Sequence, residues 1–262
     1  LESTYGGRND YQTDQKQAEQ NLIEIVKTTT ENGGKVIIPA FAVGRSQEIM
    51  LVLEEAMRTG ELSELPVYLD GMIWEATAIH AAYPEYLRDD LRKRIFYDDE
   101  NPFLAPQFHH IERGDEQRQE IQDEGPCVII STSGMITGGP IMSWLEYLGN
   151  DPANTLIFVG YQAHGTLGRR IQSGWEEIPV SGSGGRTRTL KLKFNVETVD
   201  GFSGHADRQG LLDFVKSMHP RPEKVLCVHG DERSTRDLSS ALYRQFNIRT
   251  FAPKNLETFR FV

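Results

Sequence analysis

Short apolar runs and longer segments of helical period alternate along this chain. The runs contain four to six mostly apolar and often β-branched residues, which is typical of strands that are buried on both faces. They occupy residues 35–40, 66–69, 127–132 and 155–159. Because a helical segment follows each run, the pattern predicts an α/β fold with a parallel sheet and helices on both of its faces.

The segments between the runs carry apolar residues at every third or fourth position, as amphipathic helices do. In the first of them, Thr13 or Asp14 can cap a helix that ends at Asn32 and the two glycines after it. Further helices are predicted at residues 45–58, 73–82, 85–94, 116–122 and 140–148.

Two histidines lie at comparable places in the C-terminal part of the chain. Apolar runs at residues 194–202 and 225–228 flank a helical segment at 211–218. A strand–helix–strand unit has parallel strands, so His205 and His229 are expected at the same carboxyl edge of one sheet, where ligands bind in such folds. A single histidine is more often structural, but two at equivalent strand ends favour a functional site.

The glycine- and serine-rich residues 179–189 fit a hairpin loop better than a linker, because a strand-like alternation follows them directly. The chain ends with an amphipathic helix predicted at residues 234–246 and two short strands at 249–252 and 258–262.

The 262 residues are enough for one large or two moderate domains with a substantial core. The formal net charge of −10 argues against a nucleic-acid partner, since phosphate contacts usually leave a basic footprint. However, 28 Lys and Arg, of which only nine are Lys, against 38 acids is also the balance of proteins adapted to high salt. In such proteins local arginine clusters still bind anions. An ordinary acidic protein is the alternative.

Cys127 and Cys227 both lie inside apolar runs, so we expect buried free thiols in a reducing compartment rather than a disulfide. No apolar run approaches 18 residues and no basic N-terminal signal occurs, which predicts a soluble, cytoplasmic protein without a membrane partner. The opening LESTYGG reads as a strand end that runs into a turn, so we interpret the chain as part of a longer polypeptide.

Three glycine-rich loops, at residues 39–48, 131–140 and 159–170, follow predicted strands and lead into helices. Backbone N–H groups at helix starts bind anions, so three such loops at one sheet edge suggest phosphates along a groove. Glycine after a strand is also routine turn chemistry, and neither a P-loop nor a dinucleotide fingerprint occurs. The candidate phosphate-binding residues are Arg45, Ser133, Gly134, Arg169 and Arg170.

The other histidines carry less information. His109 and His110 are expected in a solvated polar loop, His80 is expected to be structural on its helix, and His164 is expected at the surface. His229, even together with His205 or a nearby acid, falls short of the three or four ligands that zinc takes in proteins.

Six stretches of the chain, taken in order, resemble the motifs of the β-CASP branch of the metallo-β-lactamase superfamily. They are LESTYGG, IPAFAVGRSQE, STSGMITGGP, VGYQAHGTLGRRI, DGFSGHAD and CVHGD. This branch contains RNA-processing nucleases similar to the endonuclease subunit of the cleavage and polyadenylation specificity factor. The run PVYLDGMIWEATAIHAAYPEYL and the ending KNLETFRFV look closest to the archaeal mRNA 3′-end processing homologue that carries KH domains.

The resemblance implies two domains. Residues 7–203 would form a β-CASP domain inserted into a metallo-β-lactamase (αββα) domain, of which residues 1–6 and the C-terminal βαβ part, 204–262, belong to this chain. It also implies RNA as the partner and a pair of zinc ions as the cofactor. The implied activity is hydrolysis of RNA phosphodiesters in 3′-end formation or transcription termination.

Motif by motif, the resemblance makes Glu2 the motif A acid, His205 the motif B histidine and His229 the motif C zinc ligand. Glu2 would orient His205, and His205 would protonate the leaving oxygen in a two-metal reaction. The family's other metal ligands, an HxHxDH cluster, a later histidine and a bridging aspartate, belong before LESTYGG. Because one histidine does not retain zinc, we expect this chain alone to be metal-free and inactive.

The full-length protein is then expected to be an endo- or exoribonuclease. The alternative is a catalytically silent RNA-binding or scaffold subunit that has lost its metal ligands, and the presence of both His205 and His229 favours the enzyme. We also expect exposed apolar faces in the C-terminal region, which favour a homodimer through that region.

Overall fold

The computed structural model describes residues 1–181 and 187–260, and it divides into two compact units. The large unit comprises Asp14–Phe202. The small unit is discontinuous in sequence and comprises Leu1–Thr13 and Ser203–Val262, so its first segment runs seven residues beyond the boundary expected from the sequence. Each unit has its own hydrophobic core.

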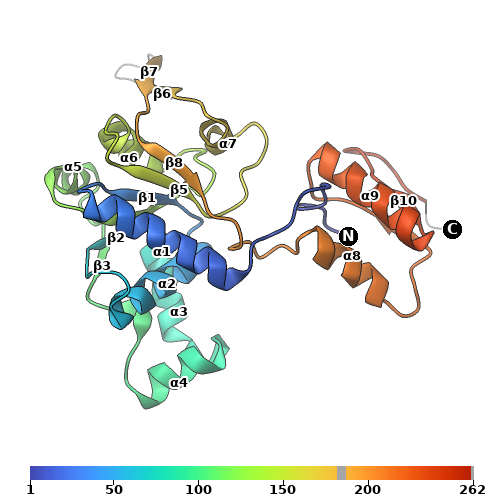
Figure 1. Ribbon diagram of the computed structural model, residues 1–262, viewed down its shortest axis with the longest axis horizontal. Coiled ribbons are helices and arrows are strands. Elements are labelled where there is room, and N and C mark those ends of the chain that lie inside the picture. Colours follow the sequence, from blue (N-terminus) through green and yellow to red (C-terminus); the bar gives the residue numbers. More distant parts are fainter. Residues whose placement is uncertain (182–186, 261–262) are drawn as a thin grey trace. The chain divides into compact units, whose positions relative to one another are not determined.

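The large unit is built on a six-stranded sheet in which every pair of neighbouring strands is parallel. The strand order is β3-β2-β4-β1-β5-β8 (Figure 1). This confirms the α/β parallel-sheet prediction, and all four apolar runs are strands. The strands are β1 (Val36–Pro39), β2 (Val67–Asp70), β3 (Phe108–His110), β4 (Val128–Ser131), β5 (Thr155–Phe158) and β8 (Asn195–Thr198).

Helices cover both faces of this sheet because successive side chains of a strand point to opposite sides. In β1, Val36 and Ile38 join one core cluster and Ile37 joins the other. The first cluster packs against α1 (Gln15–Glu31), α2 (Arg45–Thr59) and α3 (Ile73–Ala82). The second packs against α5 (Asp115–Asp123), α6 (Ile141–Leu148) and α7 (Leu167–Gln172) (Figure 1).

The helix ends follow the local chemistry of the sequence. Asp14 caps α1 by accepting a hydrogen bond from the backbone N–H of Lys16 at 3.2 Å. Gly60 ends α2 in the left-handed conformation, with φ of 77°, which glycine adopts without strain. The helix predicted at 85–94 is instead a 3₁₀ turn, η1 (Pro84–Tyr86), and a separate helix, α4 (Asp89–Tyr97), because Leu87 and Arg88 are extended.

The prediction that His109 and His110 lie in a solvated loop was wrong. They belong to strand β3, which pairs with β2 at the edge of the sheet, and a second 3₁₀ turn, η2 (Pro102–Leu104), precedes it. The ring of His110 stacks on Trp74 at 5.4 Å between centroids. The strand escaped the hydrophobic pattern because an edge strand of three residues with two polar side chains has no apolar run.

The predicted βαβ unit that joins residues 194–202 to 225–228 was also wrong. Strand β8 pairs with β5 in the large unit, whereas β9 (Lys224–Leu226) pairs in parallel with β10 (Arg249–Phe251) in the small unit. The helices of the small unit are α8 (Arg208–Ser217) and α9 (Glu232–Phe246). Just after β9, Val228 forms a parallel β-bridge with Glu2, the one isolated bridge among the described residues.

The remaining strands β6 (Glu177–Ser181) and β7 (Thr187–Lys191) pair antiparallel, which confirms that a hairpin rather than a linker follows α7. The tip of the hairpin predicted at 179–189 lies partly outside the described residues. Residues 258–260 are not in a strand, contrary to expectation, and the last two residues of that predicted strand are also outside the described part. Cys127 and Cys227 are buried free thiols, as predicted. No helix in the described ranges is long and apolar enough to cross a membrane.

Candidate active site

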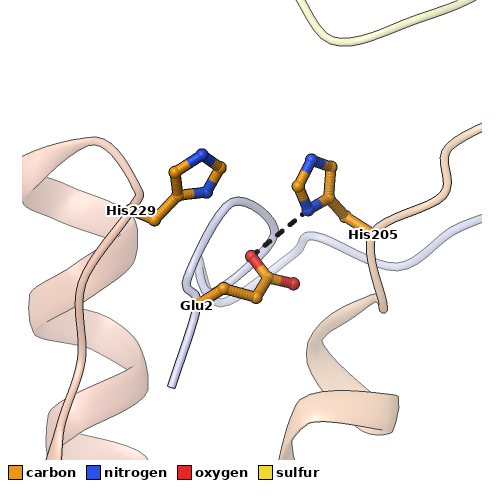
Figure 2. Close-up of side chains that lie close together, drawn as sticks. All are labelled: Glu2, His205 and His229. Carbon is orange, nitrogen blue, oxygen red and sulfur yellow. Dashed lines mark ion pairs between the residues drawn. The ribbon is translucent and has the colours of Figure 1, made fainter.

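Glu2, His205 and His229 come together in the small unit although they lie far apart in the sequence (Figure 2). The Nδ1 atom of His205 lies 3.6 Å from Oε2 of Glu2, and the centroids of the two imidazole rings are 5.5 Å apart. One ligand atom from each of the three side chains lies within 4.8 Å of the others. The side chains of His205 and Glu2 are 42% and 31% exposed, so the group is open to a substrate.

The backbone around His229 fixes the place of its ring. Glu2 bridges Val228, and the backbone N–H of Ser3 donates to the carbonyl oxygen of His229 at 3.3 Å. His229 has φ of 55°, a conformation that a residue with a side chain adopts at a cost of about 1–3 kcal/mol. At Gly230 a Cβ would stand 2.4 Å from the carbonyl oxygen of Ser3, so only glycine fits there.

The loop that carries His205 is held by the N-terminal segment of the same unit. The side chain of Gln12 donates from Nε2 to the carbonyl oxygen of His205 at 2.8 Å. Asp207 caps α8 by accepting from the backbone N–H of Gly210 at 2.8 Å. Arg208 is only 9% exposed, and its guanidinium donates to the carbonyl oxygen of Gly6. These contacts place His205 beside Glu2.

The donor set suits a zinc ion by its chemistry, since imidazole nitrogen and carboxylate oxygen are both zinc donors. Within the described residues, the polar contacts of both histidine rings are at Nδ1, which leaves Nε2 of each ring available as a metal donor. The structure brings Glu2 and His205 within reach of the same metal ion as His229, whereas the sequence predicted too few ligands around His229. Three donors are the minimum that protein zinc sites use.

Cys227 does not extend this donor set. It is fully buried in the core of the small unit, and burial raises the pKa of its thiol to about 11. A zinc ligand must be a thiolate, which this environment disfavours. Its role is packing between β9 and α9.

In the large unit, the three glycine-rich loops leave adjacent strands, because β1 lies between β4 and β5. The backbone of the loop after β1 is so close to Gly134 that a Cβ there would stand 3.0 Å from both Ala40 C and Phe41 N. The loop after β5 contacts the second loop through Gln162, whose Nε2 donates to the carbonyl oxygen of Gly134 at 2.9 Å. The loops therefore form one continuous surface at the carboxyl edge of the sheet.

This edge is also where the chain changes direction. The loop after β1 leads to α2, which packs on one face of the sheet, whereas the loops after β4 and β5 lead to α6 and α7 on the other face. Helices that leave neighbouring strands toward opposite faces open a crevice at the strand ends, and ligands bind at such switch points in open α/β sheets.

The predicted phosphate-binding residues differ in how free they are. Arg45 is partly buried, pairs with Glu48, and lies over the ring of Phe202 at 5.8 Å. Ser133 accepts at Oγ from the backbone N–H of Thr137 at 2.9 Å. Only Arg169 and Arg170, on α7, are exposed. Arg170 lies 4.9 Å from the ring centroid of Trp175.

Two residues with a place in these sites escaped the sequence reasoning. Phe41 is 52% exposed in the loop after β1, and an exposed aromatic ring in a loop beside arginines is the available signal. Thr4 is 6% exposed and contacts both histidine rings, at 3.5 Å from His205 Nδ1 and 3.2 Å from His229 Nδ1. Nothing in the local sequence distinguishes Thr4 from a turn residue.

A separate cleft of about 1050 Å³ in the large unit lies along α1, α2 and α4. It does not suit phosphates, because its acidic side chains outnumber its basic ones. The acids are Glu19, Glu48, Glu54, Glu55, Glu61, Asp90, Asp98 and Glu100, and the bases are Lys16, Arg58, Arg88 and Arg94.

Two known domain families match consecutive parts of the chain. Residues 46–171 match the Beta-Casp domain, and residues 189–253 match the Zn-dependent metallo-hydrolase RNA specificity domain. The second match covers His205 and His229 but not Glu2, so the two histidines lie in a domain of the metallo-hydrolase class. The chain belongs to the β-CASP family of that class.

Archaeal proteins named transcription termination factor FttA are similar to the whole chain. The relative in Methanosarcina mazei is 55% identical over 259 residues, which cover 99% of this chain and 41% of that protein. The relative in Thermococcus kodakarensis is 53% identical over 261 residues, with 99% and 40% covered. A Lokiarchaeum relative is 44% identical over 257 residues, with 98% and 40% covered. The chain thus spans about two fifths of the length of the curated relatives it matches.

Proposed function

We propose that the full-length protein is a metal-dependent RNA nuclease that acts in transcription termination and RNA 3′-end formation. The observation that carries this proposal is the open group of Glu2, His205 and His229, with an acid 3.6 Å from one imidazole and a second imidazole beside it. The small unit is then part of a metallo-β-lactamase domain, and the large unit is its β-CASP insertion. Similarity to archaeal termination factors supports the proposed process.

Zinc is the proposed cofactor, supported by the match to a Zn-dependent metallo-hydrolase domain and by the nitrogen and oxygen donors of the group. When bound, zinc supplies a hydroxide nucleophile and stabilises charge on a phosphate. In this chain His229 is the proposed ligand. The other ligands of a two-metal site would come from outside this chain, so the chain alone is proposed to be metal-free and inactive.

His205 is the proposed proton donor to the leaving oxygen of the RNA. A proton donor must be held in reach and oriented, and the carboxylate of Glu2 provides a compensating negative charge 3.6 Å from Nδ1. The backbone N–H of Thr4 donates to Oε2 of Glu2 at 2.8 Å, which fixes the carboxylate in turn. The proton therefore leaves from Nε2, the nitrogen that faces away from Glu2 (Figure 2).

RNA is the proposed substrate, bound by the large unit at the edge where the three loops meet. Arg169 and Arg170 are exposed there and suit phosphates, and Phe41 offers an exposed ring for base stacking. Ser133 and Gly134 would contribute through the backbone conformation of their loop at this RNA-binding edge. Arg45, which pairs with Glu48, would act by holding its loop rather than as a free cation.

A catalytically silent RNA-binding or scaffold subunit is the second candidate. It would bind RNA through the exposed Arg169 and Arg170 without chemistry at the acid–histidine group. For either candidate function, we also propose a homodimer that forms through the C-terminal region and a cytoplasmic location. Association is supported by exposed apolar side chains on the small unit, Phe214, Met218, Tyr243 and Leu256.

The test of activity uses the full-length protein with zinc and a labelled single-stranded RNA. We expect cleavage by the wild type, loss of cleavage in His205→Ala, and unchanged RNA affinity in that variant. Glu2→Gln, which keeps the shape of the side chain, should reduce the cleavage rate as well. Cleavage by His205→Ala at the wild-type rate would contradict the assignment, and absence of cleavage by a zinc-loaded wild type would favour the scaffold.

The test of RNA binding compares two double variants with the same change in charge. Arg169→Ala with Arg170→Ala should weaken RNA binding and reduce the salt dependence of log K by about 0.7 per lost phosphate contact. Arg88→Ala with Arg92→Ala, at the start of α4, is the control and should change neither, since each of these arginines already pairs with an aspartate. Equal effects of both pairs would mean that binding is nonspecific attraction to the whole surface.

A further inference from the structure

Thr4 occupies the centre of the acid–histidine group, and its hydroxyl reaches both rings. Its Oγ1 atom lies 3.2 Å from Nδ1 of His229 and 3.5 Å from Nδ1 of His205. The same hydroxyl donates to the backbone carbonyl oxygen of His229 at 3.3 Å. The side chain is 6% exposed, so water competes little for these contacts.

The single proton of a hydroxyl limits which of these contacts it can donate to and which it must accept. A threonine hydroxyl carries one proton and two lone pairs, and a carbonyl oxygen can only accept. When the proton of Thr4 goes to the carbonyl of His229, the two lone pairs remain for the rings. Each Nδ1 must then carry a proton and donate it to Thr4.

The position of Glu2 points in the same direction for His205. An ionised carboxylate only accepts, and Oε2 of Glu2 lies 3.6 Å from Nδ1 of His205. The negative charge of the carboxylate therefore favours a proton on Nδ1, which that nitrogen can donate to the hydroxyl. A neutral imidazole carries a proton on one nitrogen only, so Nε2 of both rings is left with a lone pair.

We propose that Thr4 is a positioning residue that holds His205 and His229 together in the Nδ1–H tautomer. Both Nε2 atoms then present a lone pair on the side of the group away from Glu2 (Figure 2). On the proposed function, on which this part of the inference rests, Nε2 of His229 binds the metal ion, and Nε2 of His205 takes up a proton from solvent to give the imidazolium that then protonates the leaving oxygen. One hydroxyl thus prepares two rings for two different tasks.

The backbone explains why a side chain is needed for this purpose. His229 has φ of 55°, in the left-handed region, and the neighbouring Gly230 is packed against Ser3. The hydrogen bond from Thr4 to the carbonyl of His229 joins the strained residue to the segment that carries Glu2. The tautomer and the backbone conformation of His229 are therefore fixed by the same hydroxyl.

The test reads the tautomers directly by two-bond ¹H–¹⁵N NMR of the metal-free chain labelled on histidine. Spectra are taken at a pH above which the imidazole signals no longer change, and the two rings are assigned with His205→Gln and His229→Gln. We expect the Nδ1–H form for both rings in the wild type and in Thr4→Ser, which keeps the hydroxyl. In Thr4→Val, which has the same shape without it, we expect His229 to shift toward the Nε2–H form.

Thr250→Val is the matched control, since Thr250 also donates a hydroxyl to a backbone carbonyl of the small unit, that of Ser239 at 2.9 Å. It should leave both tautomers unchanged. An Nε2–H form of His229 in the wild type would overturn the proposal, as would identical spectra of the wild type and Thr4→Val. If Thr4→Val does not fold, the wild-type and Thr4→Ser spectra still decide the matter.

A second measurement, the kinetics of RNA cleavage, distinguishes failure of this inference from failure of the proposed function. In the full-length protein, Thr4→Val should lower kcat for RNA cleavage about tenfold or more, with KM little changed, and Thr4→Ser should restore most of the rate. If His205→Ala still cleaved RNA, the proposed function would fail, but the tautomers of the metal-free chain would be unaffected. If the tautomers differ from those expected, the role of Thr4 fails whatever the activity.

Discussion

The buried carboxylate of Asp70 accepts the indole N–H of Trp144 at 2.7 Å. The same carboxylate receives two hydrogen bonds from Arg118, at 2.7 and 2.9 Å. Asp70 is 2% exposed and Trp144 is fully buried. These bonds tie the end of β2 to helices α5 and α6, beside the loop that carries Ser133.

Asp70→Ala should destabilise the large unit by about 3–5 kcal/mol, because it leaves the charge of Arg118 and the indole of Trp144 without their acceptor. Urea denaturation followed by tryptophan fluorescence measures this. Asp115→Ala is the control, since Asp115 is 63% exposed and contacts the same Arg118. Its cost should stay below about 1 kcal/mol. Similar losses in both variants would mean that the network contributes no more than a surface pair.

Gly134→Ala should destabilise the large unit by about 1–3 kcal/mol, since the new Cβ would meet the backbone at Ala40 and Phe41 at 3.0 Å. Hydrogen exchange of the loop after β1 should increase as that loop moves. Gly160→Ala is the control, because a Cβ at Gly160 meets nothing within 4 Å. A Gly134→Ala variant as stable as Gly160→Ala would show that the loops are not packed as described.

The buried thiols predict a loss of stability at alkaline pH. Burial raises the pKa of Cys127 to about 12, although the positive charge of Lys35 opposes the shift. A thiol in the unfolded chain has a pKa of about 8.5, so the unfolded state loses its proton first and stability falls as the pH rises from that value toward 12. The slope is at most about 1.4 kcal/mol per pH unit for this thiol.

Cys127→Ala should therefore flatten the dependence of the urea midpoint on pH above about 8.5, although its stability at neutral pH is lower. Cys227→Ala should do the same for the small unit, because burial raises the pKa of Cys227 to about 11. Slopes that match the wild type in both variants would assign the alkaline loss to other groups.

Metal retention distinguishes two uses of the acid–histidine group. We expect the isolated chain, loaded with zinc and desalted, to hold well below one equivalent by elemental analysis, because His229 alone is a weak site. It should also fail to hydrolyse RNA. One equivalent of zinc in the wild type that is lost in both Glu2→Gln and His205→Gln would instead make all three side chains ligands. RNA hydrolysis by the chain that stops with EDTA would contradict the expected inactivity.

Much of the large unit followed from local pattern. Strands β1, β2, β4 and β5 are apolar on both faces because helices cover both sides of the sheet. Strands of this kind can be recognised from the sequence as continuous apolar runs. Helix ends at Asp14 and Gly60 followed from capping chemistry. Strand β3 could not be predicted in this way, because its extended conformation depends on pairing with β2 and not on an apolar run of its own.

The candidate site divides in the same way. Its motifs drew attention to Glu2, His205 and His229, and the family resemblance supplied their roles, which remain predictions. The sequence placed the histidines on one sheet through a βαβ unit that does not exist, since β8 and β9 lie in different sheets. The rings nevertheless meet, because the N-terminal segment bridges Val228 and holds the loop of His205 through Gln12.

The sequence by itself determined the alternation of strands and helices, the buried thiols and the residue types of the site, because each depends on local spacing and polarity. Only the tertiary structure decided that β1 lies between β4 and β5, that Arg45 is already paired, and that Thr4 touches both histidines. These relationships join residues far apart in the chain, and no periodicity records such contacts. The proposed role of the Thr4 hydroxyl depends on the fold, which brings two imidazole rings into contact with it.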